Sequence, residues 1–154
     1  MKLYLVQHGE AAKKEIDPDR PLTGRGVEDI DRLAAFLGRA GVQVERVLHS
    51  GKRRAVQTAE RLAGSVAAGV ALETTGLVNP ADNPKEFAWQ NASWDKDMLV
   101  VSHLPFLAKL VSYLVGADEA RSIVAFQPGT AVCLERSDDA RWQINWMLRP
   151  ELLA

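Results

Sequence analysis

Three histidines, His8, His49 and His103, each follow a short apolar run of the kind that forms a buried strand. In an open α/β sheet, the carboxyl ends of parallel strands lie side by side at the edge where ligands bind. Two or three imidazoles are therefore expected to converge at one edge of a sheet. Gly9 follows His8 directly and would let the backbone turn sharply and leave room for a ligand.

Arg54 adds a positive charge to this group. It lies one turn inside a helix that is expected to begin directly after Ser50, and a helix N-terminus attracts anions through its dipole and its free N–H groups. The guanidinium offers forked donors for phosphate oxygens. A neutral imidazole whose other nitrogen is hydrogen-bonded can attack phosphorus, and a second imidazole can stabilise the charge that develops. These residue types together predict a phosphoryl-binding site.

The same residues also admit other roles. A histidine behind a strand can be purely structural, and this interpretation suits His49 best. Three histidines could bind zinc, but no pair has helical i, i+4 spacing and only Glu10 lies beside them. No metal or cofactor is therefore predicted. Cys133 lies in the apolar run TAVCLE and is interpreted as a small buried side chain instead of a nucleophile.

The elements that must position these residues alternate along the chain. Apolar patterns predict strands at 3–6, 44–49, 70–73, 98–101, 130–136 and 141–148, and helices between Thr23 and Gly38 or Gly41, at 52–62 closing near Gly64, at 84–92 and at 105–115 with Pro105 in the first turn. Residues 12–20 and 75–85 are expected to be loops.

This order predicts an α/β fold with a layered, mostly parallel sheet and helices on both faces. The last two strands form a hairpin that supplies antiparallel edge strands. In the final strand, Trp142, Ile144, Trp146 and Leu148 alternate with polar residues or methionine, which predicts that they share one face. The 154 residues are expected to form one domain, 1–154.

The composition disfavours several classes of partner. Nineteen basic and twenty acidic residues leave a net charge of −1, so no overall field attracts nucleic acid or a membrane. No segment approaches the roughly 20 apolar residues of a membrane span, and the first apolar run is too short for a signal peptide. One cysteine excludes a disulfide framework and favours a reducing compartment, so a cytoplasmic location is expected.

The stretch LYLVQHGEA at 3–11 resembles the opening of the histidine phosphatase superfamily, whose hallmark is Arg-His-Gly after the first strand. The resemblance continues through RPLTGRG at 20–26, SGKRRAVQTAERL at 50–62 and LVVSHLPFLAKLV at 99–111. The short chain and its RPLT and SHLP segments are most similar to the SixA-type phosphohistidine phosphatases. This resemblance implies a phosphoglycerate-mutase-like fold and a metal-independent phosphatase that forms a phosphohistidine intermediate.

The resemblance also implies roles for individual residues. His8 would be the nucleophile that becomes phosphorylated, Arg54 would clamp the phosphate, and His103 would be the second histidine of the pocket. Gln7 and Gly9 flank His8 in the phosphate-binding hallmark.

Three further residues have less direct assignments. Arg20 stands in the family's R-P-L-T segment, where it either rims the phosphate pocket or is a solvated loop charge. Arg53 is about 100° around the helix from Arg54 and should point away from the site. His49 falls outside the family's motif.

Two departures from the family pattern bear on activity. Gln7 replaces the hallmark arginine, and a neutral hydrogen bond contributes about 0.5–1.5 kcal/mol against about 1.5–3 for a charged one. The loss is on the order of 1–2 kcal/mol, or roughly 5- to 30-fold in rate. Larger members place a glutamate after the third strand as proton donor, whereas this chain has Thr74-Thr75-Gly76-Leu77 near that point, with Glu73 early.

The missing acid favours one class of substrate. An alkoxide leaving group needs a proton donor, whereas the imidazole that leaves phosphohistidine can accept its own proton. A phosphohistidine in a signalling or phosphotransfer protein is therefore expected in preference to a small phosphorylated substrate. A second hypothesis is a non-catalytic member of the fold that binds an anion or a protein, having lost activity through the change at Gln7.

Overall fold

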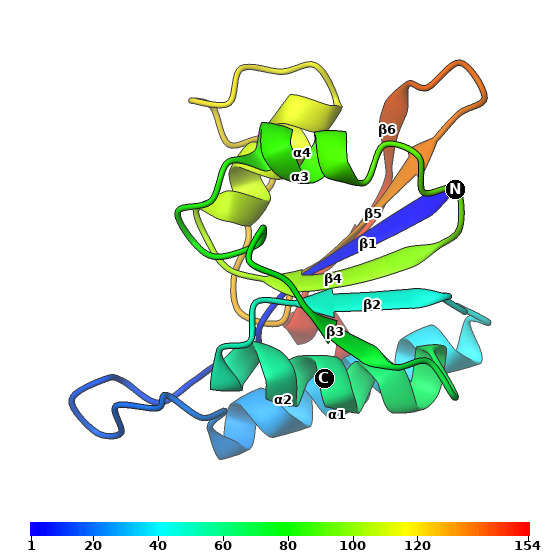
Figure 1. Cartoon of the computed structure of the whole chain (residues 1–154). Coiled ribbons are helices and arrows are strands. Elements are labelled where there is room, and N and C mark those ends of the chain that lie inside the picture. Colours follow the sequence, from blue (N-terminus) through cyan, green and yellow to red (C-terminus); the bar gives the residue numbers. More distant parts are fainter.

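The computed structural model describes all residues, Met1–Ala154, and its centre is one six-stranded sheet (Figure 1). The strands lie in the order β3-β2-β4-β1-β5-β6. Their bounds are β1 (Lys2–Gln7), β2 (Arg46–His49), β3 (Leu72–Thr74), β4 (Met98–Ser102), β5 (Ala131–Arg136) and β6 (Trp142–Leu148). The first four strands are mutually parallel, and β5 and β6 add an antiparallel hairpin at one edge. The predicted mixed, mostly parallel sheet is confirmed.

Helices cover both faces of this sheet, as the sequence predicted (Figure 1). The helices α1 (Gly24–Arg39) and α2 (Arg53–Val66) pack on one face, and α3 (Pro84–Gln90) and α4 (Phe106–Leu114) pack on the other. A short 3-10 helix, η1 (Pro150–Leu153), contacts α1 and was not predicted.

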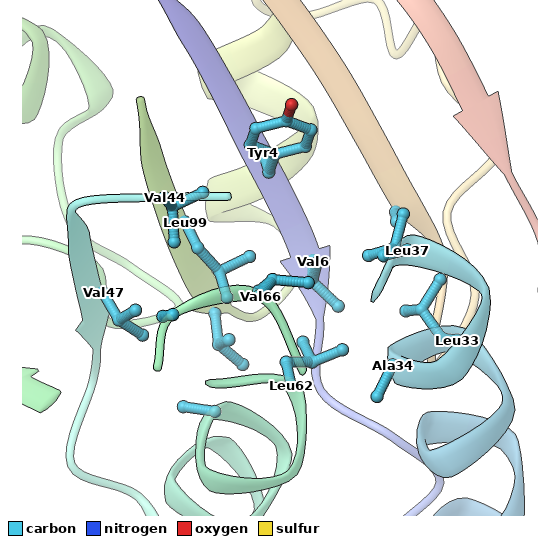
Figure 2. Close-up of a cluster of buried hydrophobic side chains, with 14 of the residues drawn as sticks. Tyr4, Val6, Leu33, Ala34, Leu37, Val44, Val47, Leu62, Val66 and Leu99 are labelled. Atoms are coloured by element: carbon cyan, nitrogen blue, oxygen red, sulfur yellow. The ribbon is translucent and has the colours of Figure 1, made fainter. Parts of the chain in front are cut away.

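The strand β1 is buried on both faces, which explains its uninterrupted apolar run. Figure 2 shows that Tyr4 and Val6 of β1 lie in the cluster formed with α1 and α2. Leu3 and Leu5, which alternate with them along the strand, pack in the cluster on the α3 and α4 side. Because β1 and its neighbour β4 lie in the middle of the sheet, the residues that follow them are held by strands that are packed on both faces.

The helix α1 begins where its sequence signals indicate. The Thr23 side chain caps the helix by accepting a hydrogen bond from the Gly26 amide. Ile30, Leu33 and Leu37 recur at helical spacing and are buried against the sheet. The helix ends at Arg39, and the chain leaves it through Gly41, whose φ of +76° favours glycine.

Several predicted boundaries are shifted. The strand β2 begins at Arg46 instead of Val44, because the Val44 and Glu45 amides bond outside the ladder, to Val66 and Asp97 carbonyls. The predicted strand at 70–73 lies instead at Leu72–Thr74.

Two helix boundaries also differ. The helix α2 continues to Val66, beyond Gly64, since Val66 is buried in the core. Pro105 precedes α4 as its N-cap instead of lying in its first turn.

The prediction that one face of β6 carries both tryptophans is wrong. The register against β5 shifts between Cys133 and Leu134, so that Asn145 is the extra residue of a β-bulge. The bulge reverses the alternation of side chains along the strand. Trp146 therefore packs with the α1 and α2 cluster, and Trp142 packs with the α3 and α4 cluster.

The helices are too short or too polar to span a lipid bilayer.

Candidate active site

The candidate site lies where the two central strands end. His8 follows β1 and His103 follows β4, and these strands are parallel neighbours with Gln7 opposite Ser102. The His8 amide extends the pairing by donating to the Ser102 carbonyl at 3.1 Å. The imidazole centroids of His8 and His103 are 5.0 Å apart, with ring planes tilted by 51°. Sheet register thus brings these two predicted site residues together.

The hydrogen bonds of His8 define its tautomer. Its Nδ1 lies 2.8 Å from the Gly9 carbonyl oxygen, which can only accept, so Nδ1 carries the proton. Its Nε2 then bears the lone pair and accepts a hydrogen bond from Arg54 Nε at 3.3 Å. Burial, opposed by the Gly9 bond and reinforced by the Arg54 charge, lowers the pKa of His8 to about 4. The ring is therefore neutral at pH 7, as a nucleophile requires.

Arg54 reaches the site from the first turn of α2. Its guanidinium is partly desolvated and close to another cation, Arg20, and both effects lower its pKa. The neighbouring Arg53 points elsewhere, to an ion pair with Asp19 at 3.7 Å. This separation of the two arginines follows from their positions around the helix.

His103 is covered more fully than His8, with exposed fractions of 1% and 8%. Its Nε2 lies 2.6 Å from the Ser50 hydroxyl, while its Nδ1 has no hydrogen-bond partner. Burial, with the nearby His8, Arg54 and Lys52, lowers the pKa of His103 to about 3. Two neutral imidazoles thus lie among positive charges, an arrangement suited to an anion.

Gln7 is buried at the end of β1, and its side-chain oxygen has no hydrogen-bond partner. Buried polar atoms are normally paired, so this oxygen is an unsatisfied acceptor in the residue that precedes His8. The hallmark position is therefore polar but uncharged.

Gly9 serves packing more than ligand access. A Cβ at this position would lie 2.9 Å from Ile30 Cγ1 and 3.1 Å from the Gly26 carbonyl oxygen, so glycine allows the close approach of α1. Its amide donates to the Thr58 hydroxyl at 3.0 Å and is not free for a ligand. The interpretation that Gly9 leaves room for a ligand is replaced by this packing role.

Arg20 lies beside the site, on the loop that precedes α1. Its φ of 48° falls in the left-handed region, and its Nε donates to the Ala12 carbonyl at 3.0 Å. Its charge contributes to the lowered pKa of both His8 and His103. This position favours the pocket-rim role over that of a solvated charge.

His49 does not join the pair of imidazoles. Its Nδ1 accepts the Gly51 amide at 3.0 Å, and the ring thereby fixes the turn between β2 and α2. Gly51 has a φ of +83°, so this turn needs a glycine as well. The geometry agrees with a structural role for His49.

Glu73 is also held away from the site. Its carboxylate forms an ion pair with Arg46 at 3.0 Å on an exposed part of β2 and β3. No group of three or more His, Cys, Asp or Glu side chains is arranged to hold a metal ion.

Sequence reasoning missed two hydroxyl residues of the site, Ser50 and Thr58. Thr58 lies four residues after Arg54, hence on the same face of α2, and its hydroxyl joins the Gly9 amide to the Arg54 carbonyl. That spacing could have identified Thr58. Ser50 gave no comparable signal, since its contact with His103 spans 53 residues of sequence.

Comparisons with known proteins agree with this geometry. Residues 3–75 match the histidine phosphatase superfamily (branch 1). The chain is 29% identical to the phosphohistidine phosphatase SixA of Escherichia coli (strain K12), over 97% of this chain and 94% of that protein. It is 33% identical to an uncharacterized protein of Picosynechococcus sp., over 71% of this chain and 70% of that protein.

A solved structure shows the same architecture. The protein histidine phosphatase SixA in complex with tungstate superposes with a TM-score of 0.85 and 25% identity, over the whole of both chains. This overlap confirms the predicted phosphoglycerate-mutase-like α/β fold. Motif, sequence and fold agree in their similarity to the histidine phosphatase superfamily.

Proposed function

We propose that this protein is a metal-independent phosphatase in which His8 is transiently phosphorylated, and that its substrate is a phosphohistidine in a signalling or phosphotransfer protein. The observation that carries the proposal is the orientation of His8. The Gly9 carbonyl holds the proton on Nδ1, so the Nε2 lone pair faces Arg54 and the His103 ring. The similarity to SixA over nearly the whole chain supports both phosphatase activity and a phosphorylated protein as substrate.

In the first step, His8 Nε2 attacks phosphorus and forms a new P–N bond while the P–N bond of the substrate breaks. The ring of His8 then carries a positive charge, and the Gly9 carbonyl stabilises it by accepting the Nδ1–H bond. The leaving imidazole departs neutral when its second nitrogen is protonated. No separate acid is needed.

In the second step, water attacks the phosphorus of phosphorylated His8. The P–N bond breaks with its electron pair returning to Nε2, and inorganic phosphate leaves with the protons of the water molecule. His8 regains its neutral tautomer. The pairing of Glu73 with Arg46 accords with a reaction that uses no carboxylic acid at the leaving group.

In the proposed reaction, three groups stabilise the phosphoryl charge. Arg54 exchanges its bond to His8 Nε2 for bonds to phosphate oxygens, as a charged forked donor. Arg20 contributes a second cation from the loop before α1. His103, whose Nε2 is hydrogen-bonded to Ser50, adds a second imidazole beside His8.

A non-catalytic role is the second candidate, and Gln7 is the observation that favours it. Its amide supplies no charge where the family hallmark has arginine, and its oxygen is unpartnered. A chain of this kind would bind a phosphorylated protein or an anion without turning it over.

The test compares wild type with His8→Ala and with His49→Ala, a matched change of a histidine outside the pair. Each is incubated with a histidine-containing phosphotransfer domain carrying chemically installed phosphohistidine, and with an aryl phosphate, with and without EDTA. We expect phosphate release from the protein substrate by wild type and His49→Ala, insensitive to EDTA, and none by His8→Ala. Tungstate, an oxyanion of phosphate shape, should inhibit.

Phosphate release by His8→Ala at the wild-type rate would exclude His8 as nucleophile. Release by no form of the protein, together with retained binding of the phosphorylated domain, would establish the non-catalytic role.

A further inference from the structure

Beside the candidate site, the loop of residues 12–21 projects away from the sheet and helices as a separate arm, drawn in dark blue in Figure 1. Its base is closed by the Ala12 amide, which donates to the Pro21 carbonyl at 2.8 Å, and by an isolated bridge between Ala11 and Leu22. The Ile16 amide bonds to the Lys13 carbonyl at 2.9 Å within the loop. The arm is thus organised by its own hydrogen bonds.

Two contacts position the arm. Arg20, at its base, donates from Nε to the Ala12 carbonyl at 3.0 Å, and Asp19 pairs with Arg53 at the start of α2 at 3.7 Å. The arm is therefore tied to the first turn of α2, which also carries Arg54.

The tip of the arm presents an apolar side chain to water. Ile16 is 78% exposed, which brings no benefit to the isolated fold. The arm's charged residues are three basic and three acidic, Lys13, Lys14, Arg20, Glu15, Asp17 and Asp19, so its net charge is zero. Recognition by the arm would therefore depend on the apolar contact of Ile16 and not on attraction between net charges. Leu104, which directly follows His103, is 39% exposed.

We propose that Ile16 and the arm of residues 12–21 form a docking surface for the body of the protein that carries the phosphohistidine, with Leu104 as a second apolar contact. The proposal rests on the function given above. A chain of four residues spans at most about 14 Å, so Ile16 lies within that reach of Arg20. A standard protein interface covers about 800 Å² on each partner, equivalent to a disc of roughly 16 Å radius.

The geometry separates a protein substrate from a small one. In this proposal, a folded domain with its phosphohistidine at His8 also contacts the tip of the arm. Free phosphohistidine would fill the site without reaching Ile16. Apolar side chains at the centre of a protein interface supply much of its affinity, within a polar rim such as the lysines and acids of this arm.

The test is Ile16→Ser, with Trp89→Ser as the matched control. Trp89 is 77% exposed on α3, whose residues line a cavity with Met1 and Met98 at the opposite end of the strands. Rates are measured on free phosphohistidine and on the phosphorylated phosphotransfer domain. We expect Ile16→Ser to lower kcat/KM roughly tenfold on the domain, through KM, and to leave free phosphohistidine unchanged. Trp89→Ser should match wild type on both substrates.

Two results would overturn the docking surface and are distinguishable. If wild type hydrolyses the domain and Ile16→Ser does so equally well, the docking surface is wrong while the proposed function stands. If wild type hydrolyses neither substrate, the proposed function fails and the docking surface fails with it. Thermal unfolding of both variants checks that these exposed substitutions leave the fold intact.

Discussion

The Thr58 hydroxyl accepts the Gly9 amide at 3.0 Å and so ties the end of β1 to α2. The same hydroxyl donates to the Arg54 carbonyl at 2.8 Å, and Thr58 is fully buried. Thr58→Val would leave the Gly9 amide buried without a partner, which costs about 1–3 kcal/mol. Urea denaturation should show this loss, and activity should fall because His8 and Arg54 lose their common link. Thr58→Ser should keep most of both, and equal stability of the two variants would contradict the role.

Ser50 is predicted to orient His103. Its hydroxyl is the one hydrogen-bond partner of the ring, so Ser50→Ala would leave both ring nitrogens unpaired in a buried site. We expect kcat/KM to drop roughly tenfold, the effect of about 1.4 kcal/mol, with KM nearly unchanged. Ser50→Thr keeps a hydroxyl and should retain most of the activity. A wild-type rate for the alanine variant would exclude the role.

Gly26 should tolerate no side chain. A Cβ there would lie 2.1 Å from the Glu10 carbonyl oxygen, in the segment that carries His8 and Gly9. Gly26→Ala is therefore expected to lower the free energy of unfolding by about 3 kcal/mol. Gly24→Ala is the control, since no atom lies within 4 Å of its Cβ position and alanine favours a helix. Similar melting temperatures for the two variants would contradict this close approach.

Acid should destabilise the fold through its histidines. The pKa values of His8 and His103 lie near 4 and 3, below the ordinary 6.5, because burial disfavours their charged forms. The unfolded chain then binds more protons between pH 6.5 and 4, and stability falls as the pH drops through this window. At pH 5 each ring accounts for up to about 2 kcal/mol relative to pH 7.

Urea titrations at pH 7 and pH 5 measure this difference. His8→Asn should reduce the loss by at most about half, because His8 is one of three histidines whose pKa burial lowers, with His103 and His49. A loss of stability identical to wild type would show that His8 titrates normally in the fold.

Gln7→Arg should increase activity. The new guanidinium would restore a charged donor beside His8, which is worth on the order of 1–2 kcal/mol in the transition state, or roughly 5- to 30-fold in kcat/KM. Gln7→Met, which adds no charge and no donor, is the control and should lower the rate. Absence of activity in both wild type and Gln7→Arg would favour the non-catalytic role.

The strand ends could be predicted because the pattern that marks them lies within a few consecutive residues. An apolar run broken by polar residues marks a buried strand wherever it lies in the sheet, so His8 and His103 could be assigned to one edge from sequence. Which histidines meet depends on strand order, and β4 lies between β2 and β1. That order places His103 beside His8, whereas His49 turns to the Gly51 amide.

Other features depend on contacts that no local pattern encodes. The bulge at Asn145 inserts one residue into β6 and so separates Trp142 from Trp146, although their spacing alone indicates a shared face. The packing role of Gly9 arises from α1, whose Ile30 lies against it. Residue type indicated that glycine mattered there, but not which atoms required it.

The hydrogen bond from Arg54 to His8 has a consequence for turnover in the proposed reaction. When phosphate leaves, the guanidinium can return to the ring nitrogen that the phosphoryl group has vacated. The Nε–H that bonds the ring is then no longer available to phosphate, which favours release of the product. The resting protein then holds its reactive nitrogen shielded from solvent electrophiles until the next anion draws the arginine away.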